Sequence, residues 1–329
     1  MRGTLAAQAD AQNGLITRVQ ARLAGYSDQE MRRLLKQGGE WHAVRRGIYA
    51  DSRVWAGLTL EERHRREVCA VLLNADQHLI GSHSSAAAMQ HVGQLRSTLD
   101  RIHVLGFDID GTRAENGVQY HRGPVPRHQI THTPYGLATC LPRSAADVAR
   151  AYGFRNGLVV ADHALRTGHM REELIDVVER MRSWPGVTTA RALIDAADGG
   201  SANVGETLMR VIVASLGFGR PETQFKVEAG GRTAYIDLRL GLHLFEFDVR
   251  QKYTDEALRA AGSVPGDVVF EEKKREDWVR AATQMGMSRV VWDDCLSDAA
   301  VARCRGRLMA DVKRTIARVG LKAWMDSLA

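Results

Sequence analysis

The chain has 329 residues, of which 44% are hydrophobic and 26% are charged, a composition typical of a soluble globular protein. No apolar run approaches the roughly 20 residues that span a bilayer, and the first residues lack the apolar core of a signal peptide, so we expect a cytoplasmic protein. Four scattered cysteines without C-x-x-C spacing and twelve dispersed histidines argue against a zinc site, while the net charge of +6 mildly favours a polyanionic partner.

The N-terminal segment predicts a small helical unit closed by a β-hairpin. In "GLITRVQARLAGY", Leu15, Val19 and Leu23 recur at four-residue steps, which predicts one face of a helix. The next stretch, "GYSDQEMRRLLKQG", begins with the capping box Ser27-x-x-Glu30, which predicts a second helix. "EWHAVRRGIYA" alternates around a glycine, as a short two-stranded wing does. Helix, turn, helix and wing in this order predict a winged helix-turn-helix.

Basic side chains concentrate in the same segment. From Ile16 to Tyr49 there are seven Lys and Arg against three acidic residues, which gives a local charge of +4. The pattern places cations on the second helix and on the wing, where such a domain contacts phosphates. An ordinary solvated basic helix would carry similar charges. The preferred interpretation is double-stranded DNA binding through Arg32, Arg33, Lys36, Arg45 and Arg46.

The region from 53 to 198 predicts a mixed α/β domain. The capping box Thr59-x-x-Glu62 begins a helix, and "RIHVLGF", "GVQYHRG" and "HQITHTP" predict short strands. Four helical stretches follow, from "SAADVARAY" to "VTTARALIDAAD". The segment "ADGGSAN" then predicts a linker to the last domain.

The string "DIDGT" after "RIHVLGF" resembles the nucleophile motif of haloacid-dehalogenase-type phosphatases. That reading requires Asp108 and Asp110 at the end of a parallel strand that leads into a helix. The polar, glycine-containing link to "GVQYHRG" instead predicts a hairpin, and Asp-Gly is a common turn dipeptide. We therefore predict that both carboxylates are inert in an exposed loop.

The residues from 199 to 329 predict a third domain with a different order of helices and strands. The helix "VGETLMRVIVASLG" precedes three strand candidates, "TQFKVEA", "TAYIDLRL" and "HLFEFDVRQ". A charged helix, "FEEKKREDWVRAATQMG", then leads to the strand "SRVVWDD" and to a terminal helical stretch. The predicted order is helix, three strands, helix, strand.

Carboxylates stand out within these strands. Glu246 and Asp248 are two residues apart and so share one face of their strand, and Asp237 interrupts an apolar alternation on the strand before. Because unpaired carboxylates are costly on half-buried strands, the pattern implies a cation, and Mg²⁺ or Mn²⁺ bound by Asp237, Glu246 and Asp248 would satisfy it. Glu206 supplies a fourth carboxylate, and Lys252 would stabilise charge on an attacked phosphate, with Lys226 as an alternative. The opposing interpretation, weighted equally on spacing alone, is a structural cluster of ion pairs with Arg239, Arg250 and Lys252.

This domain resembles the PD-(D/E)xK nuclease superfamily, in the branch similar to very-short-patch-repair endonucleases. The similarity covers about residues 200–296: "GETLMR" with Glu206 and Arg210, Asp237, then "EFDVRQKY", "EEKKREDWVRAATQMG" and "SRVVW". It implies a restriction-endonuclease-like α-β-β-β-α-β fold and catalytic roles for Glu206, Asp237, Glu246, Asp248 and Lys252. Val249 stands where the branch usually has Gly, and Asp248 takes the place of the superfamily's last Lys.

The N-terminal part resembles the AbiEi-type antitoxins of abortive-infection toxin–antitoxin systems. Their Gly-Ile-x-Thr, helix-ending Gly and Arg-x-Gly-x-Tyr pattern matches here Gly14, Thr17 and Gly25, followed by "RRGIY". The middle segment, through "HRGPVPRHQITHTPYGLATCLPRSAADVAR", is similar to the continuation of those chains. The resemblance implies an autorepressor that counters a nucleotidyltransferase toxin in phage defence.

Together these features predict a multidomain α+β and α/β protein. We expect a winged helix-turn-helix over 1–52, a mixed AbiEi-like domain over 53–198 and a nuclease-like domain with a C-terminal helix over 199–329. The first functional hypothesis is a DNA-binding antitoxin that keeps a nuclease fold. The alternative is an active Mg²⁺-dependent DNA endonuclease that hydrolyses phosphodiester bonds.

Overall fold

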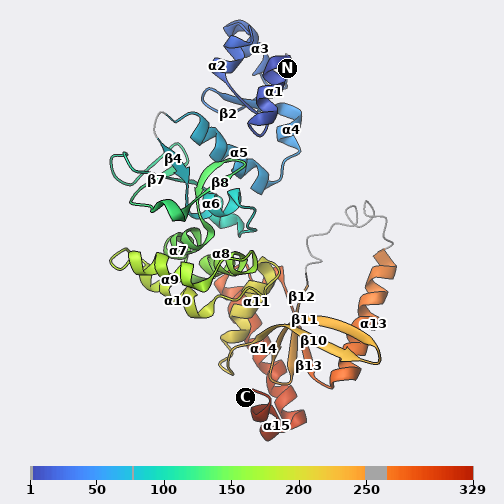
Figure 1. Ribbon diagram of the computed structural model, residues 1–329. Helices are drawn as coiled ribbons and strands as arrows, with labels where there is room; N and C mark the ends of the chain where they lie inside the picture. Colours follow the sequence, from blue (N-terminus) through green and yellow to red (C-terminus); the bar gives the residue numbers. More distant parts are fainter. Residues whose placement is uncertain (1–2, 76–77, 249–264, 329) are drawn as a thin grey trace. The chain divides into compact units, whose positions relative to one another are not determined.

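In the residues that the structure describes, helices are combined with three separate β-sheets. The computed structural model describes residues 3–75, 78–248 and 265–328 (Figure 1). The chain divides into two compact units, Met1–Ala197 and Asp198–Ala329, and the division falls within "ADGGSAN". The first unit therefore contains both of the first two domains expected from the sequence. In the described part of the chain, no helix is long and apolar enough to cross a membrane.

The first unit begins with three helices and a small antiparallel sheet. The sheet has the strand order β1-β3-β2 and buries Leu5, Ile16, Met31 and Trp41 against the helices. The bounds are α1 Gly3–Ala11, β1 Leu15–Thr17, α2 Arg18–Leu23, α3 Asp28–Leu34, β2 Trp41–Arg45 and β3 Ile48–Asp51. Ser27 caps α3 with its hydroxyl on the amide of Glu30, as its capping box predicted.

The predicted helical face of Leu15, Val19 and Leu23 is wrong. Leu15 belongs to β1 and is buried, whereas the side chains of Val19 and Leu23 are 66% and 82% exposed. Thr17 forms a capping box that starts α2 only at Arg18, so the four-residue spacing crosses a strand–helix boundary. The helix α1 was not predicted, because Leu5 and Ala9 are its only buried positions and its sequence has no strong apolar stripe.

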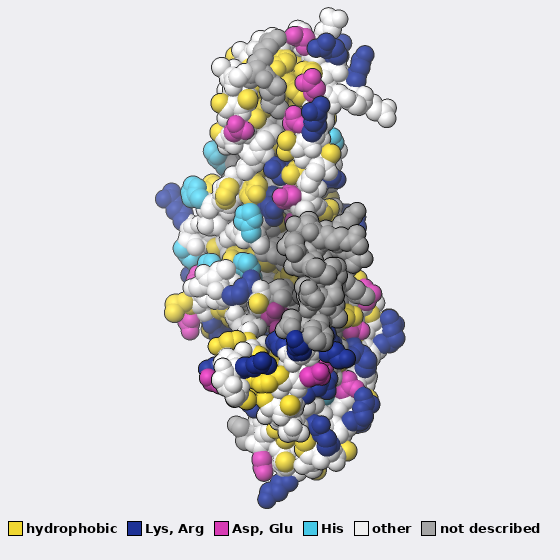
Figure 2. Space-filling view, turned by 90° about the vertical axis from the view of Figure 1, so that its right-hand side faces the viewer, with side chains coloured by type: hydrophobic (Ala, Val, Ile, Leu, Met, Phe, Trp, Pro, Cys, Tyr) yellow, Lys and Arg dark blue, Asp and Glu magenta, His cyan; other side chains and the backbone are white. Residues whose placement is uncertain are grey.

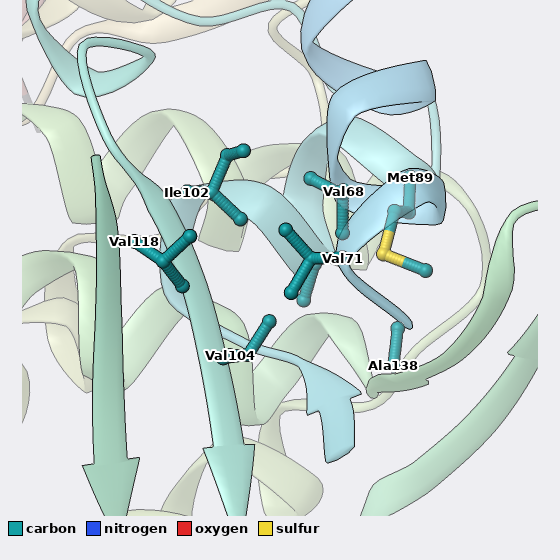
Figure 3. Close-up of a cluster of buried hydrophobic side chains, with 8 residues drawn as sticks. Val68, Val71, Met89, Ile102, Val104, Val118 and Ala138 are labelled. Atoms are coloured by element: carbon teal, nitrogen blue, oxygen red, sulfur yellow. The ribbon is translucent and has the colours of Figure 1, made fainter. Parts of the chain in front are cut away.

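A six-stranded mixed sheet follows, with the order β6-β7-β5-β4-β9-β8. Two helices, α5 and α6, pack on it through a buried cluster that includes Val68, Met89, Val104 and Val118 (Figure 3). The bounds are α4 Ser52–Ala56, α5 Leu60–Leu73, β4 Leu79–Gly81, α6 His83–Met89, β5 Ile102–Gly106, β6 Arg113–Glu115, β7 Val118–Arg122, β8 Ile130–Thr133 and β9 Gly136–Thr139.

The strand β5 does not form the predicted hairpin with "GVQYHRG". Instead β5 pairs parallel with β7, because the chain first crosses to the outer position as β6 and returns from there to β7. Asp108 and Asp110 lie in the exposed bend between β5 and β6, and a strand rather than a helix follows them. This geometry lacks the strand-to-helix connection of the phosphatase reading.

Four helices complete the first unit: α7 Leu141–Tyr152, α8 Phe154–Arg166, α9 Arg171–Arg180 and α10 Val187–Ala196. The helices α7 and α8 pack closely, since a Cβ added to Gly157 would lie 2.4 Å from the Cβ of Ala149. Inside α7, Asp147 bonds both Arg143 and Arg150, at 2.8 and 2.9 Å.

In its described residues, the second unit has the order helix, three strands, helix, strand and two helices. The strands β10, β11 and β12 are antiparallel, and β13 pairs parallel with β12 after the crossing helix α13. In Figure 1, α13 lies on the opposite side of this sheet from α14. The bounds are α11 Val204–Ala214, β10 Glu222–Ala229, β11 Arg232–Leu240, β12 His243–Asp248, α13 Pro265–Thr283, β13 Gly286–Val291, α14 Asp298–Val319 and α15 Leu321–Asp326.

Close packing fixes the helix that precedes the sheet. A Cβ added to Gly205 would lie 2.1 Å from the ring of Phe247, so the start of α11 reaches β12 only because it has glycine there. On β12, His243 bonds Thr315 of α14 at 2.8 Å and Ser288 of β13 at 3.0 Å. These contacts hold β12 in the centre of the unit, with its acidic end beside α13.

Candidate functional site

Asp237 and Glu246 lie on the same face of two neighbouring strands. Arg239 of β11 is the register partner of Leu244 of β12. Because the strands are antiparallel, Asp237, two residues before Arg239, and Glu246, two residues after Leu244, are displaced toward the same end of the sheet and share one face. One oxygen of Asp237 accepts a hydrogen bond from the backbone amide of Phe247 at 2.7 Å. The structure therefore brings together two of the three proposed metal ligands.

Arginines from later in the chain neutralise this acidic face. Nη1 of Arg275 on α13 lies 2.8 Å from Oε1 of Glu246. Arg289 on β13 lies beside both acids of β12: it is the register partner of Glu246, and its Nη1 is 3.6 Å from Oδ2 of Asp248. Arg289 also bonds Glu276 of α13 at 2.8 Å. The acidic face is therefore part of a network of ion pairs.

The counter-ions differ from those that the sequence suggested. Arg239 shares the face of Asp237 but pairs with Glu222, its direct neighbour on β10, at 2.8 Å. Arg239 therefore pairs with its neighbour Glu222 and not with the acidic pair. The expectation that Arg239 forms ion pairs with the acidic cluster is wrong. Lys226 pairs with Glu228 at 2.9 Å. Lys252 and Arg250, which the sequence also proposed, lie outside the described residues.

Glu206 has the contacts of a helix cap. Its carboxylate accepts hydrogen bonds from the amide of Ala202 at 2.7 Å and from the side chain of Asn203 at 2.6 Å. Gln224 of β10 donates a third at 3.3 Å. A carboxylate at the third position of a helix satisfies free backbone donors there, so these contacts explain its burial without a metal.

The environment of the acidic pair favours protonation. Burial raises the pKa of Asp237, and the amide of Phe247 and the charge of Arg275 oppose the rise. Burial also raises the pKa of Glu246, with a further increase from the charge of Asp237, against the opposing effect of Arg275. The raised pKa expected for a cluster without metal is present in both groups, but burial is a larger cause than repulsion.

The proposed DNA-binding cations lie mostly at the surface. Arg32 and Arg33 are exposed on α3, and Arg46 is exposed in the two-residue turn between β2 and β3. Lys36 is also exposed, but α3 ends at Leu34, so its predicted place on the helix is wrong and it lies in the following turn. Two elements, the helix α3 and the turn between β2 and β3, therefore present cations to solvent.

Other arginines of the same segment are occupied within the fold. Arg18 and Arg22 pair with Asp28 at 3.0 and 2.7 Å. Arg45 is half-buried and donates to the backbone carbonyl of Asn116 at 3.2 Å, in the turn between β6 and β7. Arg45 therefore serves the packing of the first unit as well as its surface charge.

The second unit has its own basic surface. Lys and Arg side chains are frequent on the face of this unit that Figure 2 shows, which includes α13. Lys273, Lys274 and Arg280 of α13 are exposed. These exposed side chains give α13 a basic surface.

A third cluster, of histidines, was not found from the sequence. Among the described side chains, one group of three or more His, Cys, Asp or Glu brings its ligand atoms together: His83, His103 and His121, with these atoms within 4.8 Å of one another. The rings of His83 and His121 are stacked with centroids 3.9 Å apart, and Nδ1 of His103 is 2.9 Å from Nε2 of His121. Burial lowers the pKa of His103 to about 2 and that of His121 to about 4, so both imidazoles are neutral at neutral pH.

The three histidines come from separate elements, which explains why no spacing motif revealed them. His83 begins α6, while His103 and His121 share a face of the parallel strands β5 and β7, since Leu105 pairs in register with His121. His83 has a φ of 50°, in the left-handed region that costs a non-glycine residue about 1–3 kcal/mol.

Comparison with protein-family models and with the curated proteins gives no match for this chain.

Proposed function

We propose that this protein binds double-stranded DNA through its N-terminal segment, as an antitoxin-type transcriptional autorepressor of the AbiEi kind. One observation carries the proposal: cations are exposed both on α3, as Arg32 and Arg33, and at the turn between β2 and β3, as Arg46. The element order α1, β1, α2, α3, β2, β3 with sheet order β1-β3-β2 supports a winged helix-turn-helix. In that fold α3 would enter the major groove and the turn would contact the backbone.

The proposed partners are duplex DNA and a cognate nucleotidyltransferase-type toxin. The capping box of Ser27 supports the DNA assignment, because it orients the start of α3 independently of the arginines that follow. The toxin is proposed because the N-terminal and middle segments resemble AbiEi-type antitoxins.

The test measures binding to a duplex that contains the region upstream of the protein's own gene, and to a random duplex, at several salt concentrations. Replacing Arg32, Arg33 and Arg46 with Ala should reduce the slope of log affinity against log salt by roughly 0.9 for each lost phosphate contact. The matched control replaces three exposed arginines elsewhere in the same unit, Arg127, Arg182 and Arg191. Equal slopes in the two triple variants would refute this surface.

A second candidate function is metal-dependent DNA cleavage by the second unit. Two observations favour it: the order helix, three strands, helix, strand, and the placement of Asp237 and Glu246 on one face with raised pKa values. In this proposal Mg²⁺ or Mn²⁺ would bind Asp237 and Glu246, with Asp248 at the edge of the site. The ion would have to displace Arg275 from Glu246.

Thermal melts with Mg²⁺, Mn²⁺ and EDTA, together with a plasmid-nicking assay, test the cleavage proposal. Metal at a hundredfold excess over its dissociation constant should stabilise the fold by about 2.7 kcal/mol. Asp237→Ala should abolish both the stabilisation and nicking, whereas Asp110→Asn, in an exposed bend, should preserve both. Stabilisation without nicking would indicate a metal-binding domain without activity, and neither effect in the wild type would leave the ion-pair network as the role of these acids.

A further inference from the structure

Three imidazoles from three elements meet beside the six-stranded sheet of the first unit. We propose that His83, His103 and His121 form a binding site for a divalent transition-metal ion of the zinc class. The proposal goes beyond DNA binding and cleavage, and it concerns a different unit from the acidic pair of β11 and β12.

The ligand set selects the class of metal. Imidazole nitrogen suits Zn²⁺, Ni²⁺ and Cu²⁺, whereas Mg²⁺ and Ca²⁺ take oxygen ligands. Zinc–nitrogen bonds of about 2.0–2.1 Å with tetrahedral angles place the nitrogens roughly 3.3 Å apart. The ligand atoms of the three histidines lie within 4.8 Å of one another, and one pair, from His103 and His121, is 2.9 Å apart. Zinc binding therefore requires small shifts of the nitrogens and rotation of the rings out of their present stack, so that one nitrogen lone pair of each ring points at the ion.

The outer nitrogens of two rings already have polar partners. Nε2 of His103 lies 2.6 Å from the hydroxyl of Tyr152, and Nδ1 of His83 lies 3.1 Å from the hydroxyl of Ser82. In metal sites, a ligating histidine usually donates its second N–H to such a partner, which fixes the tautomer and the ring orientation. Nδ1 of His103 and Nε2 of His83 are then the nitrogens that face the metal.

The three imidazoles can bind the metal without losing a proton from the cluster. The contact between Nδ1 of His103 and Nε2 of His121 requires a proton on one of these two nitrogens. When the ion enters, that proton moves to the other nitrogen of the same ring, and His103 donates from Nε2 to Tyr152. Each imidazole stays neutral, which is its ligating form.

The surroundings allow entry and a fourth ligand. His83 and His103 are buried, but His121 is half-buried and so connects the cluster to solvent. Three protein ligands leave one tetrahedral position for water or an anion. The charges that act on these rings come from Asp147, Arg143 and Arg150 of α7 and from Arg101 before β5, and the arginines favour an anionic fourth ligand.

The backbone of His83 supports the assignment. Its left-handed φ of 50° at the start of α6 is unfavourable for a residue with a Cβ, and such outliers concentrate at functional sites. A buried stack of hydrogen-bonded histidines without metal is the competing account.

The test uses the full-length protein without an affinity tag, stripped with EDTA and titrated with Co²⁺ while visible absorption is recorded. We expect one Co²⁺ per chain with the intense absorption of a four-coordinate ion, its displacement by Zn²⁺, and a higher melting temperature with Zn²⁺. His121→Gln and His83→Asn should lose the absorption; Asn tolerates the left-handed backbone at position 83. The control His132→Gln, at an exposed position on β8 of the same sheet, should retain it.

The positioning role of Tyr152 gives an independent measurement. Tyr152→Phe removes the partner of Nε2 of His103 and should weaken Co²⁺ binding by about 10–100-fold without changing the stoichiometry. Circular dichroism establishes which variants fold; if both histidine variants fail to fold, unchanged affinity in Tyr152→Phe overturns the proposal. Absence of the four-coordinate absorption in the wild type, or its persistence in folded His121→Gln or folded His83→Asn, also overturns it.

Discussion

Oε1 of Glu246 lies 2.8 Å from Nη1 of Arg275, and this ion pair joins β12 to α13. The same guanidinium donates from Nη2 to the backbone carbonyl of Tyr235 on β11 at 2.7 Å. Arg275 thus connects the crossing helix to both strands that carry the acidic pair. A cation that binds Asp237 and Glu246 has to compete with this arginine.

Replacing Arg275 with Gln should raise the pKa of Glu246 further and lower the stability of the second unit. The side chain of Glu246 is 11% exposed, so its charge would lose its nearest partner within a largely buried site. Because Arg275 itself is 40% exposed, we expect a loss of about 1–2 kcal/mol at neutral pH, and less once Glu246 is protonated. Urea unfolding at neutral and acidic pH measures both. An equal loss from Arg275→Gln in a Glu246→Gln background would contradict the pairing.

Local sequence signals predicted the elements well where neighbouring residues decide them. The capping boxes at Ser27 and Thr59 correctly place the starts of α3 and α5, since the bonds involve residues only three positions apart. The order of the second unit follows from alternating strands and glycine turns. Leu15 shows the limit of this approach: its place in β1 depends on pairing with Ala50 of β3, which helical spacing cannot reveal.

The candidate sites depended on contacts far apart in the chain. The sequence placed Asp237 and Glu246 together because strand alternation fixes their face. It did not identify Arg275 as the partner, because that ion pair spans 29 positions and depends on how α13 crosses the sheet. His103 and His121 share one face because β5 pairs in parallel with β7, whereas the sequence had predicted a hairpin.

Asp237 should make stability fall as the pH rises. Burial holds its pKa above the ordinary value of about 3.9, so the folded protein keeps a proton that the unfolded chain has lost. This contribution is present below the ordinary pKa and is lost as the pH rises through the raised value. Asp237→Asn keeps an oxygen for the amide of Phe247 and removes the titration. Its stability relative to wild type should therefore increase from about pH 4 to about pH 7, measured by denaturant unfolding. A flat difference would be inconsistent with the raised pKa.

Asp147→Asn should be among the most destabilising single changes in the first unit. Asp147 is 1% exposed and bonds Arg143, whose side chain is 4% exposed, at 2.8 Å. Removing the negative charge leaves a buried guanidinium without its counter-ion, which costs about 3–5 kcal/mol. Asp176→Asn is the matched control, because its pair with Arg180 lies at the surface and should contribute less than about 1 kcal/mol. Comparable denaturation midpoints for the two variants would show that the buried ion pair contributes no more to stability than the surface pair does.

Asp108→Asn should leave the protein unchanged. Asp108 is exposed in the bend after β5, and surface substitutions away from special features usually change stability by within about 0.5 kcal/mol. Assays with a generic phosphomonoester and Mg²⁺ should give no hydrolysis for either protein. Hydrolysis by the wild type that disappears in Asp108→Asn would restore the phosphatase interpretation of "DIDGT".

The adjacent residues Arg45 and Arg46 should respond differently to the same substitution. Arg46 is exposed at the turn between β2 and β3, so Arg46→Ala should reduce the salt dependence of DNA binding by roughly 0.9 in slope and leave the melting temperature unchanged.

Arg45 instead donates to the carbonyl of Asn116. Burial raises the pKa of Glu67, and the charge of Arg45 opposes that rise. Arg45→Ala therefore removes a hydrogen bond and a compensating charge within the first unit, and we expect a loss of about 1–2 kcal/mol in unfolding free energy. The salt slope of DNA binding should stay close to that of the wild type. Parallel melts and gel-shift titrations on the two variants compare these effects directly. If Arg45→Ala lowers the slope as much as Arg46→Ala does, then Arg45 contacts phosphate as well, and its bond to Asn116 opens when DNA binds.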